Sequence, residues 1–463
     1  MTLRLGREAL FHFLSQIGVT VAGFFASLTI ARVGGADTVG LYAAVVAIMF
    51  WVNVPATGIS DALTKRLTET NHSASFLATG WVIELALATT IALVIIATGP
   101  FLQEHTSVPV GPPLAVLIVC NTGLISILGT LKGQKKVAIS GGVKTTERIL
   151  RSVLHIMIIL LGYRVSALII GHAASMLIAT LIGIYFTRLR ITQPSVTTIR
   201  SLLNYAQYAW LSKLKTRAFG WMDTIVLVLF SVSPGIIGIY EVAWNIASVF
   251  ALLSISVQTT LFPEMSELSV NQEQNQIHHL LNEGLTFTGF ILIPGFFGSI
   301  ILGGQILEIY GSEFTQGVSI LSVLVLARLM TAYGDQLLNV ANGIDRPDVS
   351  FRVNTVFVVS NISLNIGLVA IFGWKGAAAA TMISGTLVAL LGYLSLAEII
   401  GRPNIPWAEL LKQLGGSVLM VCAVLLLQQY LSESYYTTIV LVMVGAGVYT
   451  LVLIAVSKRI RAK

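Results

Sequence analysis

Residues 162–186 read GYRVSALIIGHAASMLIATLIGIYF, and from Ser166 to Phe186 this stretch contains no charged side chain. About 20 predominantly apolar residues are enough for a helix to cross the hydrocarbon core of a bilayer. The stretch therefore predicts a membrane-spanning helix that follows a turn made of Gly162, Tyr163 and Arg164. Both the helix and the turn have counterparts elsewhere in the chain, and these counterparts decide the fold class.

The composition of the whole chain agrees with this prediction. Of its 463 residues, 55% are hydrophobic and 11% are charged, whereas about 25% of the residues of a soluble globular protein are charged. This composition excludes a soluble enzyme, a disordered protein and a nucleic-acid-binding domain. We expect an all-α polytopic membrane protein. Cys120 and Cys422 lie in apolar runs and are interpreted as packing residues rather than as a disulfide or a metal site.

The chain holds about 14 apolar runs of spanning length. Six precede a polar connector at residues 187–204, six follow it, and two close the chain. We therefore predict an N-terminal lobe at residues 1–204, a C-terminal lobe at 205–400 and two additional helices at 401–463. The predicted spans are Phe11–Arg32, Gly40–Ile59, Phe76–Thr98, Leu114–Leu131, Glu147–Gly162, Ser166–Phe186, Tyr205–Val232, Gly238–Phe262, Leu285–Leu302, Val318–Leu338, Val353–Phe372, Ala377–Leu396, Leu411–Tyr430 and Thr437–Val456.

The distribution of Lys and Arg predicts the orientation. With a cytoplasmic amino terminus, 24 of the 28 Lys and Arg residues fall on the cytoplasmic side; Arg32, Arg164 and Lys375 fall outside, and Arg328 falls within a span. Because positive residues are enriched in cytoplasmic loops, we expect both termini in the cytoplasm, a retained first span, and a plasma or inner membrane location. The bias also accounts for the net charge of +7 without a nucleic-acid partner.

Short motifs recur in the same order in the two halves of the chain. The Gly162-Tyr-Arg turn before the sixth span matches Gly373-Trp-Lys before the twelfth, at a spacing of 211. Likewise Gly40-Leu-Tyr matches Gly238-Ile-Tyr, and Gly133 and Gly343 are each followed within three residues by a cation. These matches predict duplicated halves of six spans. Since six is even, the halves are parallel repeats, an arrangement typical of transporters with a site between the lobes.

Further loose motifs extend along nearly the whole chain. They are Ile30-Ala-Arg32 before Gly40-Leu-Tyr-Ala, Asp223, Gly238-Ile-Tyr-Glu-Val-Ala, Leu261-Phe-Pro-Glu-Met-Ser-Glu267, Asn339 to Arg346, and Gly373-Trp-Lys-Gly-Ala-Ala-Ala-Ala-Thr-Met-Ile-Ser. In these motifs the chain resembles the Wzx-type polysaccharide-export flippases, within the superfamily that also holds lipid II flippases and MATE drug exporters. The motifs specify scaffold rather than substrate.

This resemblance implies two pseudo-symmetric six-helix lobes around a central cavity, with two additional C-terminal helices. It implies that the chain moves a polyprenyl-(pyro)phosphate-linked saccharide from the cytoplasmic to the outer leaflet by alternating access, for surface polysaccharide or glycan assembly. The partners would be the lipid-linked saccharide, membrane lipids and other polysaccharide-assembly proteins. A phosphate-linked head group cannot cross hydrocarbon alone, so the cavity should be polar and cationic.

Charged residues inside spans are the first candidates for the site, because a charge at the bilayer centre costs about 2.5–3.5 kcal/mol. In the tenth span Arg328, Thr331, Asp335, Asn339 and Asn342 recur at helical spacing. One interpretation is a cavity wall in which Arg328 contacts phosphate or an acidic sugar. The other is a set of ion pairs and hydrogen bonds that only packs the lobe.

The seventh span opens with cations that have the same two interpretations. Lys213 and Arg217 are four residues apart and share a helix face, and Asp223 follows them. They predict either a cationic funnel for the head group or positive-inside anchoring with contacts to lipid phosphates. Arg148 and Arg151, at the start of the fifth span, favour anchoring.

Polar stripes in other spans are candidates for lining a hydrated cavity. Asn53 and Asp61 lie in the second span, Glu241 and Asn245 in the eighth, and Asn361 and Asn365 in the eleventh. Each stripe is equally consistent with hydrogen bonding between helices. Glu84, alone in the third span, is expected near the interface and outside the site.

The sequence contains no phosphate-binding loop, no nucleophile elbow and no recognisable metal-ligand spacing. We therefore predict that the chain is not an enzyme and carries no cofactor. The alternative function is a cation-coupled, MATE-like exporter of small molecules, in which Asp61, Glu241 or Asp335 would bind the ion. A non-transporting scaffold is a third class, but it would leave the repeated halves and the intramembrane charges without a purpose.

Overall fold

The computed structural model describes residues 2–69, 73–106, 111–187, 192–270, 274–432 and 434–457. Within these ranges the chain forms fifteen α-helices and one short 3₁₀ helix, η1 (Ser312–Gly317), and no β-strand. The predicted all-α fold is therefore confirmed.

The chain divides into two compact units, Met1–Gly238 and Ile239–Lys463. The first unit contains α1 (Thr2–Val52), α2 (Val54–Glu69), α3 (Ser73–Thr106), α4 (Pro112–Gly133), α5 (Val137–Leu160), α6 (Val165–Phe186), α7 (Val196–Leu229) and the start of α8 (Pro234–Phe250). The second contains the rest of α8, α9 (Leu252–Val270), α10 (Gln274–Glu308), η1, α11 (Val318–Gly343), α12 (Pro347–Phe372), α13 (Trp374–Ile400), α14 (Trp407–Gln428) and α15 (Tyr435–Val456). The predicted division at 204 and 400 stays a prediction.

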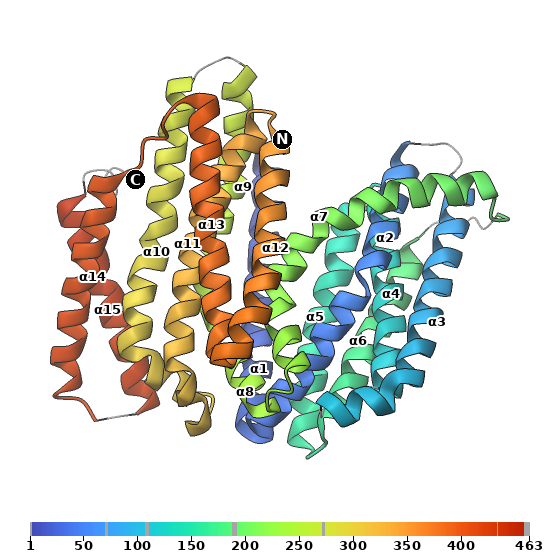
Figure 1. Cartoon of the computed structure of the whole chain (residues 1–463), viewed down its shortest axis with the longest axis horizontal. Helices are drawn as coiled ribbons and strands as arrows, with labels where there is room; N and C mark the ends of the chain where they lie inside the picture. The colour runs from blue at the N-terminus through green and yellow to red at the C-terminus, as the bar shows by residue number, and fades with distance from the viewer. Residues whose placement is uncertain are drawn as a thin grey trace. The chain divides into compact units, whose positions relative to one another are not determined.

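Each unit is a bundle of packed helices (Figure 1). In the first unit α4 and α5 pack on α6, α3 packs on α4, and α2 packs on α7. In the second unit α11 and α12 pack on α13, α10 packs on α11, and the C-terminal pair α14 and α15 packs beside α10.

The outer surfaces of both units are apolar. Large side chains such as Leu85, Leu93, Ile371 and Met443 are exposed, which suits contact with lipid tails. Within the described residues, ten helices are long and apolar enough to cross a membrane, or eleven if α8 and α9, which are bent by 42° at their junction, form one span. The chain is therefore a multi-span membrane protein, and the count of 14 spans stays a prediction.

The first two predicted spans run together in one long helix, α1. Gly35, with φ of 76°, lies between them and is the residue at which the helical conformation is broken. The second span then continues into α2 across Asn53, two residues before Pro55. Proline lacks a backbone N–H and cannot donate to the preceding turn, which explains the interruption there.

Of the turns that recur in the sequence, one pair has the same backbone geometry in both units. Lys135, between α4 and α5, and Asp345, between α11 and α12, have φ of 59° and 60°. In both turns the next residue donates its N–H five residues back: Lys136 to Leu131 at 2.8 Å and Arg346 to Ala341 at 2.9 Å. Gly162 and Gly373 both have positive φ, 80° and 58°, but their turns differ, because four residues separate α5 from α6 and only Gly373 separates α12 from α13.

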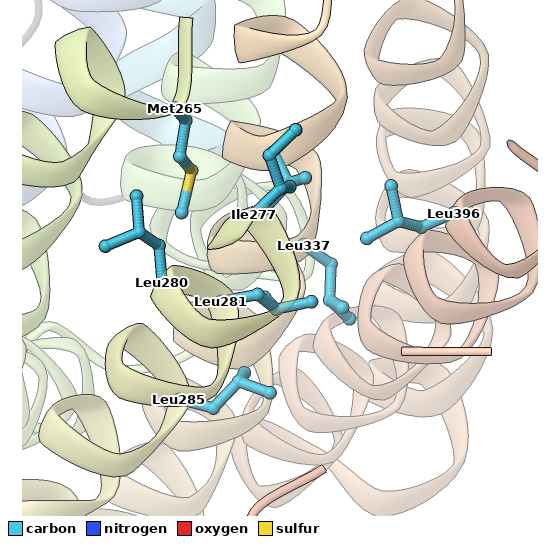
Figure 2. Packing of buried hydrophobic residues seen from close by; sticks show 8 residues of the cluster. Met265, Ile277, Leu280, Leu281, Leu285, Leu337 and Leu396 are labelled. Atoms are coloured by element: carbon cyan, nitrogen blue, oxygen red, sulfur yellow. The ribbon is translucent and has the colours of Figure 1, made fainter. Parts of the chain in front are cut away.

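A cluster of aliphatic side chains joins four helices of the second unit. Figure 2 shows its labelled members approaching one another from α9, α10, α11 and α13. The many van der Waals contacts between such side chains stabilise the packing of the four helices. The cluster consists of Met265, Ile277, Leu280, Leu281, Leu285, Leu337, Val340 and Leu396.

The Gly-aliphatic-Tyr motifs contact each other within the first unit. A Cβ atom on Gly40 of α1 would overlap the backbone of Pro234 and Gly238, and a Cβ on Gly238 would overlap the carbonyl of Ala36. Glycine is required at these two positions because the backbones of α1 and α8 touch there.

We expect Gly40→Ala to lower the free energy of unfolding by about 1–3 kcal/mol, because the added methyl group has to push the two backbones apart. Thermal unfolding of the purified protein in detergent measures the change. Gly23→Ala is the matched control on the same helix, since a Cβ there meets no atom within 4 Å. Equal stability of the two variants would contradict the close contact.

Candidate functional site

The intramembrane cation of the second unit, Arg328, is held by two side chains of α8. The centre of its guanidinium lies 3.9 Å from the centroid of the Trp244 ring, and Nη2 donates a hydrogen bond to Oγ of Ser248. A cation over an aromatic face and against a hydroxyl is stabilised where water is scarce. Arg328 itself is half-buried, so part of the side chain is open to a ligand.

The polar residues of α11 differ in burial. Asp335 and Asn339 are half-buried like Arg328, Asn342 is exposed, and Asn339 donates to the carbonyl of Gln258 on α9 at 3.1 Å. Thr331 is the member that suits the packing interpretation. It is buried, donates to Ala327 O at 2.8 Å, and lies where a Cβ on Gly385 of α13 would collide. Its hydroxyl satisfies the backbone of its own helix at the α11–α13 contact.

The predicted stripe on α8 lies near Arg328. Glu241 is half-buried and Asn245 is exposed, and Asn245 donates to Oε1 of Glu241 at 3.4 Å. Ser248, one turn further along, is the residue that accepts from Arg328. The second unit therefore brings together three of the predicted residues, Arg328, Glu241 and Asn245, on α8 and α11.

The predicted polar residues of the first unit are more dispersed. Asn53 is fully buried, and Thr122 of α4 donates to its Oδ1 at 3.0 Å. This is the helix-to-helix hydrogen bond that the sequence left open as an alternative to a cavity position. Asp61, two turns further on α2, is half-buried.

One of the predicted cations of α7, Arg217, lies against an aromatic ring of α1. Arg217 is half-buried, with its guanidinium 4.5 Å from the centroid of Phe50, and Phe50 lies 5.1 Å from the ring of Trp221. Asp223 is buried on the same helix. The side chain of Lys213 lies outside the described residues.

A buried polar network that sequence reasoning missed joins α1, α5 and α6. Arg151 Nη1 lies 3.0 Å from His172 Nε2, and Tyr42 Oη lies 2.9 Å from His172 Nδ1. Because a guanidinium can only donate, Nε2 of His172 must accept. The proton of the neutral imidazole is therefore assigned to Nδ1, which donates to Tyr42.

A carboxylate completes this network. Glu147 Oε1 lies 3.6 Å from Arg151 Nε and 3.8 Å from His172 Nε2, and Ser175 donates to it at 3.4 Å. Glu147 and His172 are buried, whereas 28% of the Arg151 side chain is exposed. The network therefore fixes the position of a guanidinium whose side chain is partly exposed, which suits binding of an anion.

The signal that could have identified this network is the repeat itself. Arg151 and His155 of α5 stand 210 residues before Asn361 and Asn365 of α12, the stripe that the sequence did single out. In the second unit these positions hold neutral amides, and Asn361 donates to Thr381 at 3.4 Å.

Comparison with known proteins gives one family match. The family described as polysaccharide biosynthesis protein matches residues 29–319. The chain is 29% identical to the probable flippase AglR of Haloferax volcanii, across 99% of this chain and 98% of that protein. It is 26% identical to the probable low-salt glycan biosynthesis flippase Agl15 of the same organism, across 82% and 81%.

Solved structures share the fold at low sequence identity. The lipid II flippase MurJ in an inward closed conformation superposes with a TM-score of 0.79 at 16% identity, covering 96% of this chain and 98% of that one. An inward-facing multidrug resistance MATE family transporter of the MOP superfamily has a TM-score of 0.68 at 14% identity, covering 82% and 94%.

We expect Glu147→Ala to destabilise the first unit, because it leaves the partly buried Arg151 guanidinium without its carboxylate. Breaking a fully buried pair typically costs about 3–5 kcal/mol, and the partial exposure of Arg151 places the expected loss below that range. Glu69→Ala is the control, since Glu69 pairs with Lys65 and Arg66 at an exposed position, where a pair contributes about 0–1 kcal/mol. Thermal unfolding of both variants in detergent measures the difference, and an equal loss would contradict the network.

Proposed function

Since the chain belongs to the family of polysaccharide biosynthesis proteins, we propose that it is a flippase for a lipid-linked saccharide. It carries a polyprenyl-(pyro)phosphate-linked saccharide from the cytoplasmic to the outer leaflet, for surface polysaccharide or glycan assembly, by alternating access. It is a transporter and not an enzyme. Two relatives that match most of the chain, AglR and Agl15, are described as probable flippases.

The observation that carries this proposal is a partly exposed guanidinium inside each unit. Arg328 in the second unit and Arg151 in the first unit are both held by neighbouring side chains, and both are themselves only partly buried. A guanidinium binds phosphate through paired N–H donors. Since charges within a membrane are costly, such residues mark a substrate pathway more often than a packing role.

The proposed substrate-contacting set combines the sequence candidates with the network of the first unit. The primary contacts are Arg328 and Arg151, and further polar residues of both units are the hydrogen-bonding neighbours of the saccharide. Asn53 acts indirectly, since its hydrogen bond to Thr122 positions α2 on α4. The remaining proposed members are Asp335, Lys213, Arg217, Asp223, Glu241, Asn245 and Asp61.

We propose 14 spans with both termini in the cytoplasm. Beyond the ten helices that satisfy length and hydropathy, the proposal counts α1 twice, because Gly35 divides it, and adds α5, α7 and the bent pair α8–α9. The helices α5 and α7 carry several charges, which lowers their mean hydropathy but suits a cavity wall.

The orientation can be tested by thiol labelling in a background without Cys120 and Cys422. A membrane-impermeant maleimide added to intact cells should label Arg164→Cys and Lys375→Cys, which lie in the proposed outer turns. Lys135→Cys and Asp345→Cys should be labelled only after permeabilisation. The reverse pattern would contradict the proposed orientation.

The function can be tested with the purified chain in liposomes, by measuring transbilayer movement of a labelled polyprenyl-phosphate saccharide. Loss of a charge-assisted hydrogen bond costs about 1.5–3 kcal/mol, so we expect Arg328→Ala to slow movement by about tenfold or more. Arg352→Ala is the control, because Arg352 is exposed and pairs with Asp348. Arg328→Lys should restore only part of the rate, since lysine keeps the positive charge but lacks the paired N–H donors of the guanidinium.

Two outcomes would overturn parts of this proposal. Wild-type movement in the folded Arg328→Ala protein would remove Arg328 from the site and leave the function standing. Absence of movement in the folded wild type, with or without a proton or sodium gradient, would favour the cation-coupled exporter. In that alternative Asp61, Glu241 or Asp335 binds the ion.

A further inference from the structure

A buried carboxyl group in the first unit belongs to none of the networks described so far. Glu84 of α3 is 1% exposed, and neither of its carboxyl oxygens makes a hydrogen bond. Glu84 is the eleventh residue after Ser73, where α3 begins, so it lies about 16 Å along the helix axis from that end. It therefore lies deep in the span and not at the interface that the sequence suggested.

The carboxyl group lines a cavity of about 300 Å³ between α3, α4 and α6. The cavity opens toward the apolar outer surface, because its lining includes the exposed side chains Leu85, Val119 and Leu177. Its remaining polar lining is mainly hydroxyl groups, from Thr122, Ser126 and Thr180, with the thiol of Cys120.

Most of these hydroxyl groups are already engaged. The Thr122 hydroxyl has two acceptors within hydrogen-bond distance, Ile118 O and Asn53 Oδ1, and the Thr180 hydroxyl donates to Met176 O. Ser126 Oγ is buried and is the one side-chain donor recorded beside the Glu84 carboxyl group, although the two groups do not form a hydrogen bond of standard geometry. The cavity therefore offers the carboxyl group a single neutral hydroxyl, which is not enough to stabilise a carboxylate.

None of the described lining residues is a cation. The charged groups on the surrounding helices have partners elsewhere: Lys65 and Arg66 with Glu69, Arg217 with Phe50, and His172 with Arg151. The other titratable side chains in the described parts of α2, α3, α4, α6 and α7 are Asp61, Glu104, Lys132, Tyr185, Arg200, Tyr205, Lys215 and Asp223, and none of them lines the cavity.

We propose that Glu84 is a proton-binding site and that loss of its proton is a step of the transport cycle. In the present arrangement only the neutral acid is compatible with the surroundings, since an ionised carboxylate needs donors or water. The carboxylate can form only if α3 moves against α4 and α6 and admits water. Proton release therefore selects a second arrangement of these helices. The coupling to transport rests on the proposed flippase function, whereas proton binding does not.

Proton binding can be tested without transport, by labelling with dicyclohexylcarbodiimide. A protonated carboxyl adds to this reagent: its oxygen bonds to the central carbon, its proton moves to nitrogen, and the adduct rearranges to a stable N-acylurea. Mass spectrometry of the α3 fragment should find the label on Glu84 at low pH and progressively less at high pH. Glu104→Gln, which removes an exposed carboxyl of the same helix, should keep the label, and Glu84→Gln should lose it. Absence of the label on Glu84 at every pH would overturn the proposal.

The transport step is tested with Glu84→Gln, which imitates the neutral acid in size and polarity and so keeps the fold. In the liposome assay we expect this variant to lose the pH dependence of saccharide movement, while Glu104→Gln keeps the wild-type profile. An unchanged pH profile in Glu84→Gln would overturn the coupling. If the wild type moves no saccharide, the flippase proposal fails, and the labelling result alone decides whether Glu84 binds a proton.

Discussion

Every backbone polar group in a membrane span has to find its partner within the protein, because hydrocarbon offers none. This constraint explains why the described chain consists of helices, whose backbone groups bond within one segment. Charged side chains in a span are costly for the same reason. Arg328 is held by Trp244 and Ser248, Arg151 by Glu147 and His172, and Arg217 by the Phe50 ring.

The same constraint makes the two units different despite their shared turns. At positions related by 210 residues, the first unit has Arg151 and His155 and the second has Asn361 and Asn365. Arg151 is accompanied by a carboxylate, Glu147, whereas the amide nitrogens of Asn361 and Asn365 donate to a neighbouring hydroxyl and a carbonyl group. The two units therefore share turns of similar conformation while the side chains at related helix positions differ in charge.

The sequence predicted the all-α membrane fold, the resemblance to polysaccharide-export flippases and the recurring turns, and the structure and family match confirm these. Such features depend on local composition and on the positions of glycine residues, and both can be read directly from the sequence. It did not predict the Arg151 network or the burial of Glu84, because a charge near a predicted helix end looks the same whether it anchors the helix or faces a neighbour. The sequence left two interpretations open for Thr331, a cavity wall or packing within the lobe, since helical spacing places side chains on a helix but does not say which neighbours that helix has.

The left-handed turn at Lys135 shows a conflict between backbone conformation and side-chain charge at one position. Glycine adopts this conformation freely, whereas a residue with a Cβ atom is disfavoured by about 1–2 kcal/mol, yet the chain has lysine here and aspartate at the equivalent Asp345. The lysine adds a positive charge to the loop between α4 and α5. A glycine introduced at Lys135 would therefore relax the turn and at the same time remove that charge from the loop.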